Sequence, residues 1–270
     1  MKTPYLHIVS CFVILFSVWA SSAFAQSGKD DEQSSIEFAP NKDIPFLTYK
    51  VKGGRRLLRG ATQTPRLQIW PSGKMVCATL GADSFETELS QEDVKKLVSD
   101  LVVDKKIYDL SAETIQKAIE KTGEKVYFQN GPSSNIEINL QRGKHVLDIV
   151  SADLTLLKFP EMKEMKRAKE IERTLEQAMA KAMLGGERQQ KKALKKINAA
   201  LKAEHAKKYE PFKSEDVKFA NRLKGGTTRL TLEKIVEDKE TKSSSRLIGK
   251  YTKDADGKES VSTSIWGMRK

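Results

Sequence analysis

The stretch MKEMKRAKEIERTLEQAMAKAM, from Met162 to Met183, carries apolar side chains at intervals of three and four residues. This spacing places them on one side of an α-helix, so the stretch predicts an amphipathic helix of about six turns. Pro160 precedes the stretch, while Gly185 and Gly186 follow it and predict a break. The chain is thus expected to contain a long helix between its two ends.

A second amphipathic helix is expected from Glu187 to Lys208. Leu194, Ile197 and Leu201 share one of its faces, and basic residues outnumber acidic ones by eight to two along the segment. This predicts a basic helix that could bind a polyanion. The candidate binding residues on its other face are Arg188, Lys191, Lys192, Lys195, Lys196 and Lys202.

Residues 1–25 have the pattern of a secretory signal peptide. Lys2 precedes an apolar run that ends at Ala23-Phe24-Ala25, the small-x-small pattern at which a signal peptidase cuts. Residues 26–43 are polar and aperiodic, and they predict a flexible leader. The chain is therefore expected to be exported, either to a bacterial periplasm or outside the cell, with no transmembrane segment after cleavage.

Cleavage of the signal peptide would remove Cys11 and leave Cys77 alone, so no internal disulfide is expected. No cysteine follows the cleavage site, where a bacterial lipoprotein would need one, and release without a lipid anchor is expected. Cys77 lies in a strand-like run at 75–80, which is typical of a buried thiol.

Residues 44–160 combine strand and helix patterns. Ser90 and Asp93 form a capping box at the start of one predicted helix, and a second short helix is expected at 111–121. Alternation at 136–150 around Arg142-Gly143 predicts a hairpin. Further strands are expected at 47–51, 67–70, 75–80 and 85–89.

Residues 211–270 return to a strand pattern, with candidates at 217–223, 227–236, 245–251 and 259–266. The whole pattern predicts an α+β fold. We expect an antiparallel sheet with inserted helices at 44–160, a long helical connector at 161–210 broken near Gly185-Gly186, and a small C-terminal antiparallel β-meander at 211–270.

Part of the first domain resembles a known group of proteins. The runs Leu67–Val76, Leu89–Val94 and Ile107–Leu110 resemble the strand-turn-strand, helix and short-loop order of uncharacterised secreted α+β proteins of planctomycete-type bacteria. The resemblance covers residues 45–150. It implies a bacterial envelope setting and no particular activity.

No motif of the sequence compels a reaction. After signal cleavage only His145 and His205 remain as histidines, too few for a typical zinc site, and no Gly-x-Ser-x-Gly elbow is present. The spacing of the methionines between Met162 and Met183 could serve copper(I), yet it is also what a core stripe requires. Asp254-Ala255-Asp256-Gly257 resembles the start of a calcium loop without its remaining ligands, and it predicts a hairpin turn. We expect no cofactor, no metal site and no catalytic residue.

Two carboxylate pairs keep an enzyme open as the alternative, since two acids suffice for glycoside hydrolysis. Glu86 and Glu88 share a strand face, and Glu137 lies across a hairpin from Asp148. A hydrolase should show a concave pocket lined by converging polar groups. A scaffold should instead show flat sheets and a charged helix.

The distribution of charge favours a binding function. Residues 26–160 carry nineteen basic and nineteen acidic side chains, whereas residues 211–270 carry fourteen basic and nine acidic ones. The positive field thus belongs to the C-terminal half and favours polyanions such as acidic polysaccharide or an anionic lipid surface. Nucleic acid is not expected, because the basic helix lacks aromatic side chains for stacking. We therefore expect an exported, non-enzymatic protein that binds a polyanion or a protein partner, or that serves as a scaffold.

The mature protein is expected to begin at Gln26, because the Ala-Phe-Ala site ends at Ala25. Intact-mass measurement of the exported protein checks this. Exported protein that still carries Met1 to Ala25 would contradict it.

Overall fold

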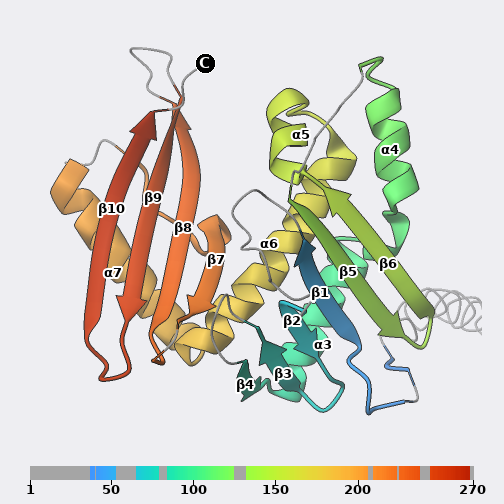
Figure 1. Ribbon diagram of the computed structural model, residues 1–270, viewed down its shortest axis with the longest axis horizontal. Helices are drawn as coiled ribbons and strands as arrows, with labels where there is room; N and C mark the ends of the chain where they lie inside the picture. Colours follow the sequence, from blue (N-terminus) through green and yellow to red (C-terminus); the bar gives the residue numbers. More distant parts are fainter. Residues whose placement is uncertain are drawn as a thin grey trace, which may run out of the picture.

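The computed structural model describes residues 37–39, 41–52, 65–78, 84–124, 132–205, 209–223, 225–237 and 244–267. The expected signal peptide and most of the expected leader lie outside these residues. Within them, the fold is α+β, as the sequence predicts. It contains a six-stranded antiparallel sheet with inserted helices, two long helices and a four-stranded antiparallel meander (Figure 1).

The first sheet has the strand order β4-β3-β2-β1-β5-β6. Buried side chains alternate with more exposed ones along most of its strands, so one face is buried and the other is open. The strands are β1 (Leu47–Lys52), β2 (Leu67–Ile69), β3 (Lys74–Cys77), β4 (Phe85–Glu88), β5 (Ser133–Leu140) and β6 (Gly143–Val150).

The two helices that the sequence predicts in this part of the chain each begin at a serine cap, of which the sequence predicts the first. Ser90 accepts a hydrogen bond from the backbone N–H of Asp93 at 3.0 Å, and Ser111 forms a capping box with Thr114. These residues start α3 (Gln91–Ser99) and α4 (Ala112–Glu120). Two short turns lie between them, a π-helical one (Asp100–Asp104) and a 3-10 one (Ile107–Asp109).

The short helix α5 (Ala152–Lys158) follows β6 and has no counterpart in the sequence prediction. It begins after Ser151, whose φ of 50° is the left-handed conformation that lets the chain leave the strand abruptly. Thr155 in α5 is fully buried. The helix therefore depends on its packing against α6, which no local pattern of the sequence shows.

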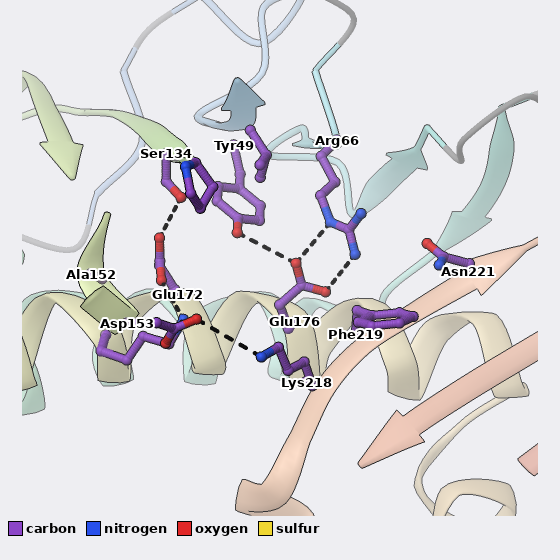
Figure 2. Close-up of a pocket in the computed structure, with 13 residues that line it drawn as sticks. Tyr49, Arg66, Ser134, Ala152, Asp153, Glu172, Glu176, Lys218, Phe219 and Asn221 are labelled. Carbon is purple, nitrogen blue, oxygen red and sulfur yellow. Dashed lines mark hydrogen bonds and ion pairs between the residues drawn. The ribbon is translucent and has the colours of Figure 1, made fainter. Parts of the chain in front are cut away.

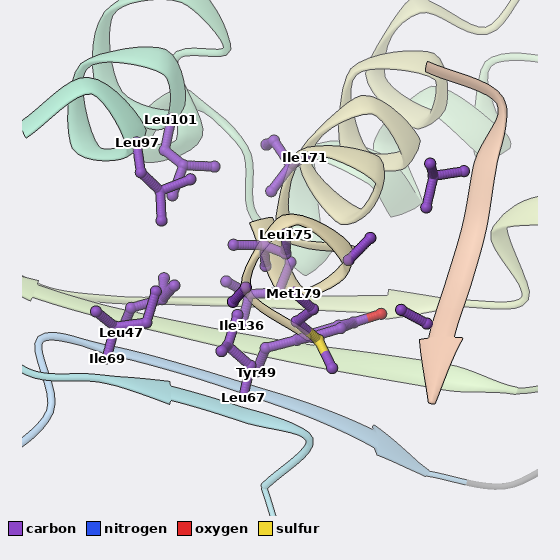
Figure 3. Packing of buried hydrophobic residues seen from close by; sticks show 14 of the residues in the cluster. Leu47, Tyr49, Leu67, Ile69, Leu97, Leu101, Ile136, Ile171, Leu175 and Met179 are labelled. Atoms are coloured by element: carbon purple, nitrogen blue, oxygen red, sulfur yellow. The ribbon is translucent and has the colours of Figure 1, made fainter. Parts of the chain in front are cut away.

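The long helix α6 (Lys163–Leu184) packs against both sheets. Ile171, Leu175 and Met179 are fully buried and lie over the first sheet beside Tyr49 and the neighbouring apolar strand residues (Figure 3). The same helix contacts β7 and β8 of the meander. The buried side chains of both sheets thus form one continuous hydrophobic core around α6.

The chain turns between α6 and α7 (Glu187–His205) at Gly185 and Gly186. Their φ angles of 85° and 106° are ones that glycine adopts without steric cost. After the 3-10 turn Ser214–Asp216, the meander has the order β10-β9-β8-β7. Its strands are β7 (Val217–Arg222), β8 (Thr228–Glu237), β9 (Ser244–Lys253) and β10 (Glu259–Gly267).

Helix α7 lies close against the meander at Gly249 in β9. A Cβ atom added there would meet Ile197 Cγ2 at 2.6 Å and the Phe212 ring at 2.9 Å. Glycine is therefore required at this position, because any larger residue would push α7 away from the sheet.

We expect Gly249→Ala to lower the free energy of unfolding by about 1–3 kcal/mol, because the added methyl group overpacks this contact. Urea denaturation measures the loss. In an Ile197→Ala background the same substitution should cost less, since that variant removes Cγ2. An unchanged unfolding midpoint for Gly249→Ala alone would show that α7 does not pack here as described.

Candidate functional site

Helix α7 buries its aliphatic face and exposes its opposite side. Ala193, Ile197 and Leu201 are buried, and the helix contacts β9 and β10. Asn198 fixes the chain that follows, since its side chain both donates to the Phe212 carbonyl at 2.9 Å and accepts from the Phe212 N–H at 2.7 Å. The orientation of α7 on the sheet is thus set from both sides.

The structure divides the six predicted binding residues into two groups. Lys192 and Lys196 lie beside β10, where both form ion pairs with Glu259, a carboxylate whose side chain is only 16% exposed. These two lysines therefore neutralise a half-buried acid. They help to attach α7 to the sheet and are less available to a ligand.

The other four basic residues form what we call the α7 stripe: Arg188, Lys191, Lys195 and Lys202. All four are exposed, and at 100° per residue their positions fall within about one sixth of the helix circumference. Lys191 pairs with Glu187 at 2.6 Å, but both side chains are more than half exposed, so solvent weakens this pair. The stripe presents cations to the solvent along one line.

A second polar feature is a cavity of about 290 Å³ between the two sheets (Figure 2). Its walls come from β1, β5, α5, α6 and β7. Three acidic and three basic side chains line it: Asp153, Glu172, Glu176, Arg66, Lys169 and Lys218. This is the concave, polar pocket that an enzyme would require, so the bonds that these groups make decide its chemistry.

Glu176 of α6 is bound to Arg66 by a bidentate ion pair. Arg66 Nε and Nη2 donate to its two carboxylate oxygens at 2.7 and 2.9 Å, and the Tyr49 hydroxyl donates to Oε1 at 3.4 Å. Burial disfavours the charged guanidinium, but Glu176 outweighs this effect and raises the pKa of Arg66. Burial, followed by the nearby carboxylates, raises the pKa of Tyr49, so its hydroxyl stays protonated and continues to donate.

Glu172, one turn earlier on α6, is bound in the same manner. Ser134 Oγ donates to its Oε1, and Lys169 Nζ lies 3.0 Å from Oε2. Lys169 also pairs with Asp153 of α5 at 3.1 Å. Although burial favours the neutral amine, Glu172 and Asp153 raise the pKa of Lys169.

Lys218 continues the network from α5 to the meander. Its Nζ lies 3.9 Å from Asp153 and 3.0 Å from Glu233 of β8, which in turn pairs with Arg246 of β9 at 3.2 Å. Burial favours neutral Asp153, but Lys169 and Lys218 outweigh it and lower the pKa of that carboxyl. The ion pairs therefore run from α6 through α5 to the second sheet.

This network leaves the cavity without a free acid or base. Every carboxylate oxygen of Glu172 and Glu176 already accepts a hydrogen bond or an ion pair from the protein. Catalysis by a carboxylate pair needs one group to donate a proton and the other to attack or to activate water. The arrangement instead holds buried charges in mutual neutralisation, as a structural network requires.

The sequence prediction missed Glu172 and Glu176, which occupy the same face of α6 because they are four residues apart. One signal was present: each follows an aliphatic residue of the predicted stripe, Ile171 or Leu175, and so lies at the edge of the buried arc. A charged residue at the edge of a buried arc is unusual and could have marked the site. The sequence could not supply the partner, because Arg66 is remote from Glu176 in the chain.

The carboxylates that the sequence singled out lie apart from the cavity. Glu86 and Glu88 are exposed on the edge strand β4, and Glu86 pairs with Lys74 at 3.2 Å. Glu137 pairs with Lys144 at 2.8 Å on the open face of the first sheet. On the same face, Asp148 accepts a hydrogen bond from Asn135 at 2.8 Å.

The histidines, the Asp254 turn and the methionines, which the sequence also singled out, make ordinary structural contacts. His145 lies against the Tyr108 ring and His205 against Tyr209. Asp254 accepts a hydrogen bond from Lys258 N–H at 2.7 Å and closes the β9–β10 hairpin turn. Met162, Met165, Met179 and Met183 are buried in the core. In the described ranges, no three His, Cys, Asp or Glu side chains are grouped so that they could hold a metal ion.

Cys77 is a free, fully buried thiol on β3, as the sequence predicts. Burial raises its pKa to about 12, so the reactive thiolate is scarce at neutral pH. The residue is therefore part of the core, with no exposed position from which to react.

No family model, no curated protein and no solved structure matches the chain. None of the helices in the described part of the chain is long and apolar enough to span a membrane.

Removal of Arg66 tests whether the cavity network is structural. Arg66→Met leaves the Glu176 carboxylate buried without its counter-charge, and we expect it to lower the free energy of unfolding by about 3–5 kcal/mol. The double variant Arg66→Met/Glu176→Leu should recover most of this loss, because it removes both charges. Urea denaturation at neutral pH measures both effects.

The matched control is Lys105→Met, which breaks the exposed pair with Glu170 and should cost less than about 1 kcal/mol. If Arg66→Met costs no more than this control, Glu176 does not depend on Arg66.

Proposed function

We propose that this chain is an exported, non-enzymatic binding protein that holds an acidic polysaccharide on the α7 stripe. The observation that carries the proposal is the division of the basic residues on α7. Lys192 and Lys196, although their side chains are 56% and 42% exposed, both pair with the largely buried Glu259, whereas the four exposed stripe residues have no such buried acid among the described residues. The solvent-facing cations serve no comparable structural contact, which supports a role in binding.

The geometry of the stripe suits a linear polyanion. Arg188, Lys191 and Lys195 follow one another at about one helical turn, a repeat of roughly 5.4 Å along the axis. A chain with regularly spaced carboxylate or sulfate groups can meet a cation at each turn. The net positive charge of residues 211–270 strengthens the field around this part of the molecule.

A polysaccharide fits the stripe better than a lipid surface or a nucleic acid. The exposed positions beside the stripe include Ala199 and Ala203, and α7 carries no aromatic residue. An interfacial helix needs large apolar side chains to enter a bilayer. Single-stranded nucleic acid binding uses aromatic side chains on which bases stack.

The alternative, a secreted hydrolase, would have to use the charged cavity, because the exposed carboxylate pairs lie outside it, on the edge strand β4 and on the open face of the first sheet. Such an enzyme would need Glu172 or Glu176 to exchange its protein partner for substrate. The ion pairs with Lys169 and Arg66 oppose that exchange. We therefore place binding ahead of hydrolysis.

The stripe can be removed without touching the core. We expect the variant Arg188→Gln/Lys191→Gln/Lys195→Gln/Lys202→Gln to bind heparin, used as a sulfated probe, at least about tenfold more weakly than the wild type. Binding of the wild type should also weaken steeply as salt is added, because its contacts are screened. Isothermal titration calorimetry over a salt series measures both effects.

The matched control replaces Lys95, Lys106, Lys117 and Lys121, four exposed lysines of the first domain, with glutamine. It removes the same charge, including one lysine in an exposed i,i+4 pair with Glu113. Affinity for heparin should then change little. Equal losses of heparin affinity in the two variants, or binding that is insensitive to salt, would contradict the proposal. Tighter binding to anionic vesicles than to heparin would also contradict it and would indicate a lipid surface as the ligand.

A further inference from the structure

The four edge strands of the two described sheets differ in how they are protected from pairing with another chain. Natural edge strands are kept from such pairing by shortness, charge, proline or a bulge. β4 has four residues, two of them glutamates, and β6 carries Lys144 and Asp148. β7 has a bulge between Val217 and Phe219.

β10 has none of these four protections, although α7 packs against one of its faces. It runs for nine residues, ESVSTSIWG, with continuous register against β9 and without lysine, arginine or proline. Its single charge, Glu259, is already neutralised by Lys192 and Lys196. Among the described residues, β9 is the only strand that pairs with it, so its other edge offers unpaired backbone groups.

Apolar side chains accompany this edge. Val261 and Ile265 point to the covered face and belong to the core, yet both are only partly buried. Trp266 lies on the open face and is 65% exposed. A further strand beside β10 would bury part of each of these three side chains. A purely polar edge would gain no such apolar burial.

We propose that β10 pairs antiparallel with β10 of a second copy of this chain, about a twofold axis through Thr263. The sequence of the strand is complementary to itself in that register. Val261 faces the partner's Ile265, Ser262 faces the partner's Ser264, and Ser260 faces the partner's Trp266. All nine residues are paired, and each side chain keeps its face of the sheet. The product is a continuous eight-stranded sheet across two subunits.

The charges on α7 permit this dimer. Thr263, at the axis, contacts Glu204 near the C-terminal end of α7, whereas Glu259 at the start of β10 contacts Lys192 and Lys196. The N-terminal half of α7, which carries most of the stripe, therefore lies away from the axis. Only Lys202 of the stripe, two residues before Glu204, lies near the axis, so the other three cations of each subunit remain available to a polyanion.

The mass of the mature chain in solution tests the proposal. Sedimentation velocity should give the mass of two chains for the wild type and of one chain for Ser262→Lys/Ser264→Lys, which places like charges opposite one another at the centre of the junction. The control Ser244→Lys/Thr252→Lys adds the same charge to the same open face on β9 and should remain dimeric. A monomeric wild type, or a dimeric Ser262→Lys/Ser264→Lys variant, would overturn the proposal.

Cross-linking tests the register without relying on a destabilising variant. Under mild oxidation Ser262→Cys/Ser264→Cys should form a disulfide-linked dimer, because position 262 faces position 264 of the partner. Ser260→Cys, which faces Trp266 of the partner, should stay monomeric on the same non-reducing gel. Absence of the first cross-link, or equal cross-linking of both variants, would contradict the proposed pairing.

Discussion

The fold depends on α6 being buried against two sheets at once. An ordinary surface helix buries one stripe, but α6 covers the first sheet with Ile171, Leu175 and Met179 while it also contacts β7 and β8. Its two buried glutamates are possible only because Arg66 and Lys169 neutralise them. Both apolar packing and charge pairing therefore hold the two sheets on the same helix.

This arrangement determines which surfaces remain for function. The cavity between the sheets is polar because buried charges meet there, and those charges satisfy one another through Arg66, Lys169 and Lys218. Helices cover one face of each sheet and leave the other face open (Figure 1). The surfaces that the described part of the chain presents to solvent include two open sheet faces, the edge of β10 and the α7 stripe, all of which are suited to association.

The sequence was sufficient wherever a local pattern decides the structure. The capping residue Ser90, the hairpin at 136–150 and the apolar stripe of α6 are all read from neighbouring residues, and the α+β fold follows from them. The sequence was insufficient where tertiary contacts decide the structure. The α5 helix depends on α6, Glu172 and Glu176 depend on Arg66 and Lys169, and the division of the basic residues on α7 depends on Glu259. Arg66 and Glu259 lie more than sixty residues from their partners. Lys169 and α6 are near in the sequence, but no local pattern shows that Glu172 and Thr155 are buried beside them.

The central claim is that α6 joins both sheets into one cooperative unit, and unfolding measured from each sheet tests it most directly. Outside the expected signal peptide the chain has one tryptophan beside the first sheet, Trp70, and one in the meander, Trp266. Trp266→Phe and Trp70→Phe therefore give variants that report on one sheet each. In urea, fluorescence of each variant should show a single transition that coincides with that variant's loss of circular dichroism over the whole chain. A fluorescence transition separated from the circular dichroism transition in either variant would show that the sheets unfold independently and would contradict the account.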